Sequence, residues 1–479
     1  MELEEYFDKY RRKTIGIDHV YRTYYGERKM IYADWAASGR LYRDIEDFLV
    51  NEIGVLYGNT HSEDNYIGKF MNNCYYNAKT TIRNHVKAND DYVVLTVGYG
   101  MTAAVHRLQG IMGLYNTTDG NNNEKPIVFL TYMEHHSNYT TWLELNVDFE
   151  IINQDENGRP SLEHLESLLK KYNSRRVKIG SFSACSNITG IRTDYYKMAA
   201  LMHKNNGVCF VDFSASAPYE NMDVKCNNQE EMLDAIFFSP HKFLGGPGSS
   251  GVLIFRKELY SRNAPTIPGG GTILWTNPWG GRRYFDDIEN REDSGTPGIL
   301  QTIKAALAIQ LKENMNLACI QQREKQITDL LFSRLEKIDE ISIYEKNERD
   351  RLGIISFNID NLHYKLVVSI LSAAFGIQAR GGCSCSGLYG HYLLKIDKGA
   401  SKKITDNIDN GHMRAKPGWV RLSLNPIMSN DEVLYIAESI KLIIENSEFF
   451  LNDYTYCRGN NTFVNKKGMN SYSFKNIFI

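Results

Sequence analysis

Short apolar runs recur through the middle of the chain, and each of them ends in polar residues. The clearest five are DYVVLTVGYG (91–100), KPIVFLTYMEHHSN (125–138), VKIGSFSACSN (177–187), GVCFVDFSAS (207–216) and DAIFFSPHK (234–242). Segments with helical periodicity, such as TAAVHRLQGIMGLY (102–115), lie between them. Because buried strands that alternate with helices are typical of parallel sheets, we predict an α/β fold with a mostly parallel central sheet flanked by helices.

The polar residues that follow these runs are expected to lie close together. The carboxyl ends of parallel strands meet at one edge of a sheet, and ligands of open α/β sheets bind beyond that edge. The residues that we expect to face this crevice are Gly100, His135, Asn187, Asp212 and Lys242. The sequence thus predicts one binding site to which several strands contribute.

The sequence pattern changes after about residue 300. Segments 299–315 and 319–338 have the periodicity of long amphipathic helices, and GIISFNI (353–359) and WVRLSLNP (419–426) are typical of strands. We predict a large domain (31–300), a smaller α+β C-terminal domain (301–450) with which the N-terminal segment (1–30) packs, and a C-terminal tail (451–479). The polar insert 397–417 is expected to be a loop, and the tail shows no periodicity.

The net charge, the length of the apolar runs and the number of cysteines limit the kinds of partner and the location that we expect. The formal net charge of −2 in 479 residues argues against nucleic acid or an anionic membrane as the partner. No apolar run approaches the roughly 20 residues that span a bilayer, and the charged segment MELEEYFDKYRRK is not expected to be a signal peptide. Eight cysteines are too few for a disulfide scaffold. We predict a cytoplasmic location.

Lys242 lies in the most informative segment, SPHKFLGGPGSSG (239–251), between two apolar runs. For an isolated lysine, a surface turn is the simpler interpretation. Burial, however, lowers the pKa of a lysine and makes it a Schiff-base nucleophile, and glycines let the backbone approach a ligand closely. Since Ser239 and His241 add donors beside it, we favour a lysine that is held against a flat cofactor.

Asp212 ends another apolar run, where a carboxylate is costly to bury unless it is paired. It is either a cap for the turn that contains Ser214 or a carboxylate that keeps a pyridine nitrogen protonated, which makes the ring an electron sink. The presence of Lys242 thirty positions later favours the second interpretation.

VGYGMTAAVHRL (97–108) is typical of a strand, a glycine turn and a helix. It lacks the third glycine of a dinucleotide-binding loop, and no acidic partner for a ribose follows it. We interpret it instead as a phosphate site formed by the helix N-terminus and the Thr102 hydroxyl.

Two further motifs leave alternatives open. The histidines of EHHSN (134–138) suit a metal poorly, because adjacent residues of an extended segment point in opposite directions, and we favour one imidazole stacked on an aromatic cofactor, with no metal site. In ARGGCSCSGLYG (379–390), Cys383 and Cys385 lack the C-x2-C pairs that are typical of zinc sites. They are either structural thiols or, near Arg380, a nucleophile of lowered pKa.

Together these motifs resemble the class V aminotransferase family of pyridoxal-phosphate enzymes, and within it the cysteine desulfurase and selenocysteine lyase branch. The resemblance extends from IYADWAASGR (31–40) to VRLSLNPIMSNDEV (420–433). The motifs that carry it are SPHKFLGGPGSSG, EHHSN, SNITG (186–190), VDFSASAP (211–218), GGGT (269–272) and GTP (295–297). It implies the fold type I of pyridoxal-phosphate transferases, pyridoxal 5′-phosphate as the cofactor and a homodimer with shared active sites.

The resemblance also implies a role for each residue that matches a family motif. Lys242 would form a Schiff base with the cofactor, Asp212 would pair with the pyridine nitrogen, and His135 would stack on the ring. Further cofactor contacts would come from Met101, Thr102, Asn187, Ser239 and His241, and from Thr272 of the other subunit. Substrate contacts would come from Arg421, which would clamp a carboxylate, and from Ala37, Asn59 and His61.

The implied reaction is that of a cysteine desulfurase, which converts L-cysteine to L-alanine and leaves the sulfur as a persulfide. Cys385 matches the persulfide cysteine, Cys383 is the second catalytic candidate, and a sulfur-acceptor protein is the partner that such chemistry needs. Ala215 stands where the family has a glutamine that bonds the ring hydroxyl, so we expect either that Ser214 or Ser216 replaces it or that the pKa of the Schiff base differs. The alternatives are another class V reaction (transamination, epimerisation or a non-thiol lyase) and a catalytically idle binding protein.

Overall fold

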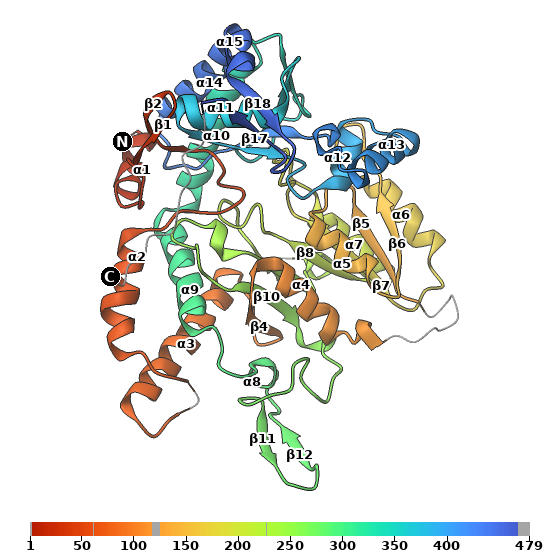
Figure 1. Ribbon diagram of the computed structural model, residues 1–479. Coiled ribbons are helices and arrows are strands. Elements are labelled where there is room, and N and C mark those ends of the chain that lie inside the picture. Colours follow the sequence, from red (N-terminus) through yellow and green to blue (C-terminus); the bar gives the residue numbers. More distant parts are fainter. Residues whose placement is uncertain (1, 61, 117–124, 227, 468–479) are drawn as a thin grey trace.

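The computed structural model describes residues 2–60, 62–116, 125–226 and 228–467 (Figure 1). Its largest element is a seven-stranded sheet with the order β4-β10-β9-β8-β7-β5-β6. The strands are β4 (Tyr92–Val97), β5 (Ile127–Thr131), β6 (Asp148–Ile152), β7 (Lys178–Ser183), β8 (Val208–Asp212), β9 (Ala235–Phe238) and β10 (Gly251–Arg256). Six strands of this sheet run in one direction, and β10, which lies between β4 and β9, runs in the opposite direction. The predicted mostly parallel sheet is therefore confirmed, and the five apolar runs form β4, β5, β7, β8 and β9.

Helices cover both faces of the sheet, and successive strand side chains enter two different apolar clusters. Phe129 joins the cluster with α3, α6, α7 and α9, whereas Val128 joins the cluster with α4 and α5. The bounds of these helices are α3 (Tyr66–His85), α4 (Gly100–Ile111), α5 (His136–Leu143), α6 (Leu162–Lys171), α7 (Tyr195–Lys204) and α9 (Ile299–Asn314). Because both faces are covered, every residue of β5, β7 and β9 is buried, which explains the continuous apolar runs of β5 and β9.

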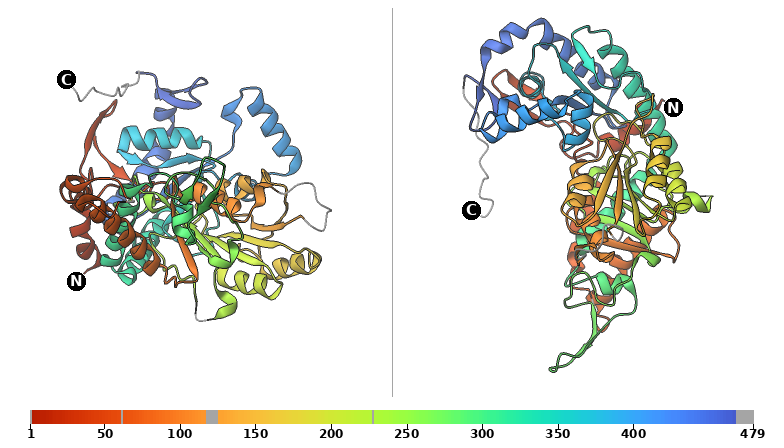
Figure 2. Two further views of the ribbon diagram at one scale, coloured as in Figure 1. Left: turned by 90° about the horizontal axis from the view of Figure 1, so that it is seen from below. Right: turned by 90° about the vertical axis from the view of Figure 1, so that its right-hand side faces the viewer.

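A smaller α+β unit follows in the chain and lies at one end of the molecule (Figures 1 and 2). Its antiparallel sheet has the order β13-β14-β17-β16, and three helices pack with it. The strands are β13 (Ile341–Ile343), β14 (Ile354–Ile359), β16 (Arg380–Gly382) and β17 (Trp419–Ser423), and the helices are α10 (Leu317–Leu335), α11 (Tyr364–Phe375) and α14 (Asn430–Glu445). The fold class predicted from the sequence is thus confirmed.

The N-terminal helix α1 (Leu3–Arg11) contacts this smaller unit. Phe7 and Tyr10 enter its apolar core, and Arg11 pairs with Glu432 of α14 at 2.6 Å. The next strands, β1 (Val20–Thr23) and β2 (Gly26–Lys29), form a hairpin, and β3 (Ile31–Tyr32) pairs in parallel with β15 (Ile377–Gln378). Segments from both ends of the chain therefore build this unit.

The prediction of a loop over residues 397–417 is wrong. The segment contains helix α13 (Lys398–Asp409) and a 3₁₀ turn, Met413–Ala415. Asp397 caps the helix by accepting from the Ala400 N–H at 2.7 Å, and Lys402 pairs with Asp406 one turn on. No residue of this helix is buried, and its three apolar residues, Ala400, Ile404 and Ile408, recur every fourth position, a helical spacing that the prediction overlooked.

The remaining elements connect or extend these two units. They are α2 (Arg43–Phe48), α8 (Ile288–Glu292), α12 (Gly387–Leu393), α15 (Ser447–Asp453) and two hairpins, β11 (Ile273–Thr276) with β12 (Arg282–Tyr284) and β18 (Tyr454–Cys457) with β19 (Thr462–Asn465). The first hairpin projects from the molecule, and the second orders the described part of the tail (Figure 1). Among the described residues, no helix is both long and apolar enough to cross a bilayer. All eight cysteines lie within the described ranges, and each is a free thiol.

Candidate active site

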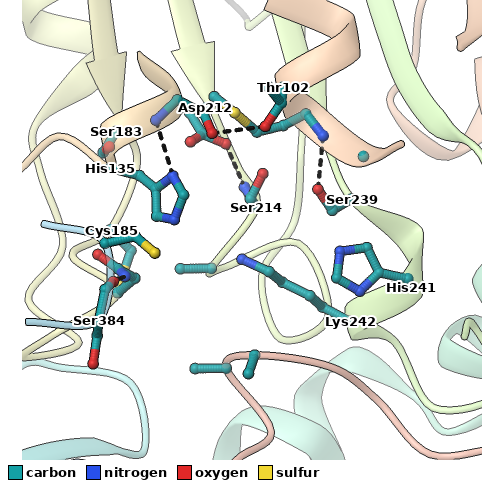
Figure 3. Close-up of a pocket in the computed structure, with 18 of the residues that line it drawn as sticks. Thr102, His135, Ser183, Cys185, Asp212, Ser214, Ser239, His241, Lys242 and Ser384 are labelled. Atoms are coloured by element: carbon teal, nitrogen blue, oxygen red, sulfur yellow. Dashed lines mark hydrogen bonds between the residues drawn. The ribbon is translucent and has the colours of Figure 1, made fainter. Parts of the chain in front are cut away.

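A cavity of about 220 Å³ lies beyond the carboxyl ends of β7, β8 and β9, beside the first turn of α4 (Figure 3). The five residues predicted from the strand ends all line it, namely Gly100, His135, Asn187, Asp212 and Lys242. So do Ala37, Met101, Thr102, Ser239, His241, Cys385 and Arg421. The last two come from the smaller unit, so the cavity lies between this unit and the central sheet.

Lys242 ends a 3₁₀ turn, Pro240–Lys242, that follows β9 directly. The chain then doubles back, because Gly245 has a φ of +79° and a Cβ atom on Gly246 would lie 1.8 Å from the Pro240 carbonyl oxygen. Only glycine fits both positions, which accounts for the glycine-rich segment. Burial lowers the pKa of the Lys242 amine to about 8, against the opposing effect of the Asp212 carboxylate. A substantial fraction of this amine is therefore neutral near pH 7 to 8.

Asp212, the last residue of β8, is 5% exposed and aims its carboxylate into the cavity (Figure 3). Burial raises its pKa, while Ser214 and the Lys242 cation oppose that rise. The Ser214 N–H donates to Oδ1 at 2.8 Å, so the capping interpretation of this residue also holds. A cation placed against the free side of this carboxylate would stabilise its ionised form.

Of the two serines expected to replace the glutamine at Ala215, only Ser214 lines the cavity. The Ser216 hydroxyl lies away from it and contacts the carbonyl oxygen of Phe213 at 3.4 Å. Ser214 is therefore the better-placed substitute.

His135 caps helix α5 with its ring. Its Nδ1 accepts from the Ser137 N–H at 3.2 Å, and burial, followed by the Lys242 cation, lowers the pKa of the imidazole to about 3. The ring is therefore neutral and carries its proton on Nε2. A neutral aromatic ring on the cavity wall suits stacking against a flat ligand.

The N-terminus of α4 forms another part of the cavity wall. Gly100 adopts a φ of +63°, and a Cβ atom there would approach Ser239 Oγ to 2.9 Å. Ser239 Oγ accepts from the Met101 N–H at 2.9 Å, and the Thr102 hydroxyl contacts that of Ser137 at 2.7 Å. Helix α4 has no side-chain cap. Hydroxyl groups and a helix N-terminus in this arrangement suit an anion such as a phosphate.

Arg421, in β17, is held by two hydrogen bonds. Its Nη1 donates to the Asn187 carbonyl oxygen at 3.0 Å, and its Nη2 donates to Asp34 Oδ1 at 2.7 Å. Arg380 Nε binds the second oxygen of the same carboxylate at 3.0 Å. Two guanidinium groups therefore share one negative charge beside the cavity, and that leaves net positive charge for a substrate carboxylate.

Several buried polar atoms of the cavity wall have no hydrogen-bond partner in the described part of the chain. They are Asn187 Oδ1, Ser214 Oγ, Ser384 Oγ and Arg421 Nε. Buried polar atoms are nearly always paired in folded proteins, so these atoms indicate a polar ligand. Together with the carboxylate, the neutral imidazole, the amine and the anion site at α4, they match the functional groups of pyridoxal phosphate.

The two cysteines of the 379–390 motif have different surroundings. Cys385 is exposed and lines the cavity, whereas Cys383 is partly buried against an apolar cluster that contains Met133 and Trp419. A third cysteine, Cys185, also lines the cavity and was missed by the sequence analysis. It is buried, and burial raises the pKa of its thiol well above the usual range, so Cys185 is not a nucleophile at neutral pH.

The remaining site predictions are not placed at the cavity. Asn59 is exposed and is not among the lining residues, and His61 lies outside the described residues. Thr272 is buried in its own chain, where its hydroxyl donates to the Gly269 carbonyl oxygen at 2.7 Å. Its contact with a second subunit stays a prediction.

Sequence reasoning missed Asp34 as the partner of both arginines, and Ser384 and Cys185 as cavity residues. Asp34 lies in the motif IYADWAASGR, so its position beside Ala37 was the available signal. For Cys185 the signal was its place directly before Ser186 and Asn187 at the end of a buried run.

The model of the class-V aminotransferase family matches residues 31–436. A protein of Staphylococcus epidermidis named as a probable cysteine desulfurase is 27% identical over 364 residues, which cover 75% of this chain and 84% of that protein. A probable cysteine desulfurase of Staphylococcus aureus is 26% identical over the same length.

Two solved structures have a similar fold. The apo structure of a cysteine desulfurase from Thermococcus onnurineus NA1 matches with a TM-score of 0.73 at 21% identity, covering 87% of this chain and 95% of that one. The cysteine desulfurase CsdA from Escherichia coli, in its S-sulfonic acid form, matches with a TM-score of 0.71 at 18% identity, covering 92% and 98% of the two chains.

Proposed function

Because this chain belongs to the class-V aminotransferase family, whose members are pyridoxal-phosphate enzymes, we propose that it binds pyridoxal 5′-phosphate and acts as a cysteine desulfurase. The overall reaction converts L-cysteine and the Cys385 thiol into L-alanine and a Cys385 persulfide. The observation that supports this most strongly is that Cys385 and Lys242 line the same cavity. An amine alone would serve many class V reactions, whereas an accessible thiol in the same cavity serves sulfur transfer.

The residues of the cavity suit each part of the cofactor. Asp212 would face the ring nitrogen, His135 would lie on the ring face, and the first turn of α4 with Ser239 would hold the phosphate. Lys242 would carry the cofactor through its amine. When bound, pyridoxal phosphate supplies an electron sink that makes the Cα–H bond of an amino acid acidic.

The protein's own groups would then bind and transform the substrate. Arg421 and Arg380 would orient the carboxylate of L-cysteine, and the neutral amine of Lys242 would take the Cα proton. The Cys385 thiolate would attack the substrate sulfur, so that a sulfur–sulfur bond forms as the carbon–sulfur bond breaks. A sulfur-acceptor protein would remove the persulfide, for which the exposure of Cys385 gives access.

A homodimer is part of this proposal. Large apolar side chains are exposed at the cavity mouth and on the projecting hairpin, where Tyr99 is 83% and Trp279 is 88% exposed, with Leu274 and Trp275 beside the latter. Exposed apolar patches of this kind mark protein contacts. Tyr99 lies directly before Gly100 of the anion site, so a partner that covered it would also enclose the cavity.

The test compares alanine and sulfide production from L-cysteine, with a thiol reductant present, by the wild type and three variants. We expect Cys385→Ser to abolish both products, and Cys383→Ser to retain them, because Cys385 lines the cavity and Cys383 does not. Loss in Cys383→Ser alone would reverse the assignment. Undiminished sulfide release by both single variants and by the double variant would overturn the persulfide reaction and favour another class V activity.

A further inference from the structure

The segment that carries the cavity thiol has an unusual backbone. This segment, Cys383–Gly387, joins β16 to α12, and we call it the cysteine loop. Ser384 and Cys385 have φ angles of 48° and 59°, in the left-handed region that residues with a side chain rarely adopt. Two such residues in succession are maintained only where surrounding contacts fix the conformation.

Those contacts come from the central-sheet side of the cavity, and each of four successive loop residues makes one. Asn187 Nδ2 donates to the Ser384 carbonyl oxygen at 2.8 Å, and the His136 N–H donates to that of Cys385 at 2.7 Å. The Ser386 hydroxyl donates to the Glu134 carbonyl oxygen at 3.1 Å, and the Gly387 N–H donates to His136 Nε2 at 2.8 Å. The loop is therefore fixed across the boundary between the two units.

His136 makes two hydrogen bonds to the loop, one through its backbone N–H and one through its ring. Its Nε2 can accept from Gly387 only while the imidazole is neutral. Burial and the nearby Lys416 cation lower the pKa of His136, which favours that form. The fit is close, because a Cβ atom on Gly387 would lie 3.0 Å from Nε2. Glycine at 387 thus lets the backbone come within hydrogen-bond reach of the ring.

We propose that His136 is the positioning residue for the reactive thiol, and that its ring holds the cysteine loop in the strained conformation that places Cys385 at the cavity. The two adjacent histidines then have separate tasks. His135 lines the cavity, whereas His136 is not a lining residue and contacts the loop. The effect on catalysis rests on the proposed function, but the restraint on the loop does not.

The test measures amide hydrogen exchange of the loop in the full-length protein loaded with pyridoxal phosphate, without L-cysteine. In His136→Leu we expect exchange of the peptide that covers residues 383–390 to rise about tenfold, because the half-buried Gly387 N–H loses its acceptor. His136→Gln, whose Oε1 can reach the same N–H, should restore most of the protection. His412→Leu is the matched control. His412 is an exposed histidine of the smaller unit, which also contains the cysteine loop, so this variant should exchange as the wild type does.

A second comparison keeps the test decisive if the leucine variant does not fold. His136→Asn has the amide of the glutamine variant on a shorter side chain, so it should leave the loop as unprotected as leucine would, while glutamine protects it. Equal protection in the wild type and in all folded variants would overturn the proposal.

Kinetics separate this proposal from the proposed function. Loosening the loop should lower kcat for sulfide release about tenfold in His136→Asn and leave KM for L-cysteine within about twofold, because only the attacking thiol is displaced. If the loop exchanges faster in His136→Leu or His136→Asn but Cys385→Ser still releases sulfide, the restraint on the loop is supported and the desulfurase reaction is rejected. If the loop exchanges at the wild-type rate in the His136 variants and Cys385→Ser releases no sulfide, the restraint is rejected and the desulfurase reaction is supported.

Discussion

The Asp212 carboxylate and the Lys242 amine share one cavity, and each affects the protonation of the other. Asp212→Asn keeps the size of the side chain and removes its charge. We expect the rate of alanine formation to fall about 10²-fold, because the ring nitrogen loses its anionic partner. The measurement is kcat for L-cysteine, with Asp223→Asn, a carboxylate near the surface that pairs with Lys87, as the control. A variant with wild-type kcat would contradict this role for Asp212.

Lys242 also makes a prediction about pH. Its pKa in the folded protein is lowered to about 8, so the neutral amine becomes the major form as the pH rises through 8. Only that form attacks an aldehyde, and the rate at which cofactor-free protein takes up pyridoxal phosphate should therefore rise from pH 7 to 9 and then level off. Stopped-flow absorbance gives the rate. A midpoint near 10.5, the ordinary value for lysine, would show that the amine is not buried as described.

Among the elements around the site, Glu134 connects the turn after β5 to helix α5 and strand β7 through hydrogen bonds. The carboxylate accepts from the Thr131 hydroxyl at 2.6 Å, from Asn138 Nδ2 of α5 at 2.7 Å and from the Ser183 hydroxyl of β7 at 2.7 Å. Burial nevertheless raises its pKa to about 7. The turn that presents His135 and His136 is thus built on a buried acid.

The sign of the resulting pH effect follows from that raised pKa. Between about pH 4.5 and 7 the folded protein binds more protons at Glu134 than the unfolded chain does, so this group lowers stability as the pH rises. In Glu134→Gln this contribution is absent. The melting temperature of the variant minus that of the wild type should therefore become more positive by roughly several degrees from pH 5 to 7.5. A difference that does not vary with pH would contradict the raised pKa.

The sequence predicted elements well where burial leaves a pattern, and poorly where it does not. The fully buried strands β5 and β9 appear as continuous apolar runs, and the polar residues after them mark the cavity. Helix α13 has no buried residue, and its few apolar residues, Ala400, Ile404 and Ile408, form too weak a pattern in a polar segment to have predicted it. The Asp34 contacts with Arg380 and Arg421 join three distant segments, and no local pattern encodes such contacts.

For the molecule as a whole, we expect a dimer of about twice the chain mass of 54.9 kDa. Exposed tryptophans on the β11–β12 hairpin should contribute to the contact, and Trp275→Asp together with Trp279→Asp should shift the equilibrium towards the monomer. Sedimentation velocity gives the masses. Tyr435→Asp, an exposed aromatic residue on α14 of the smaller unit, is the control. A wild-type protein that sediments as a monomer at micromolar concentration would contradict the shared-site model.

The role of Lys242 is tested by identifying the residue that carries the cofactor. The protein is incubated with pyridoxal 5′-phosphate, reduced with borohydride, digested and analysed by mass spectrometry. We expect one pyridoxyl phosphate group per chain, on Lys242, and none in the Lys242→Ala variant. A label spread over surface lysines, or the same extent of labelling in that variant, would contradict this role.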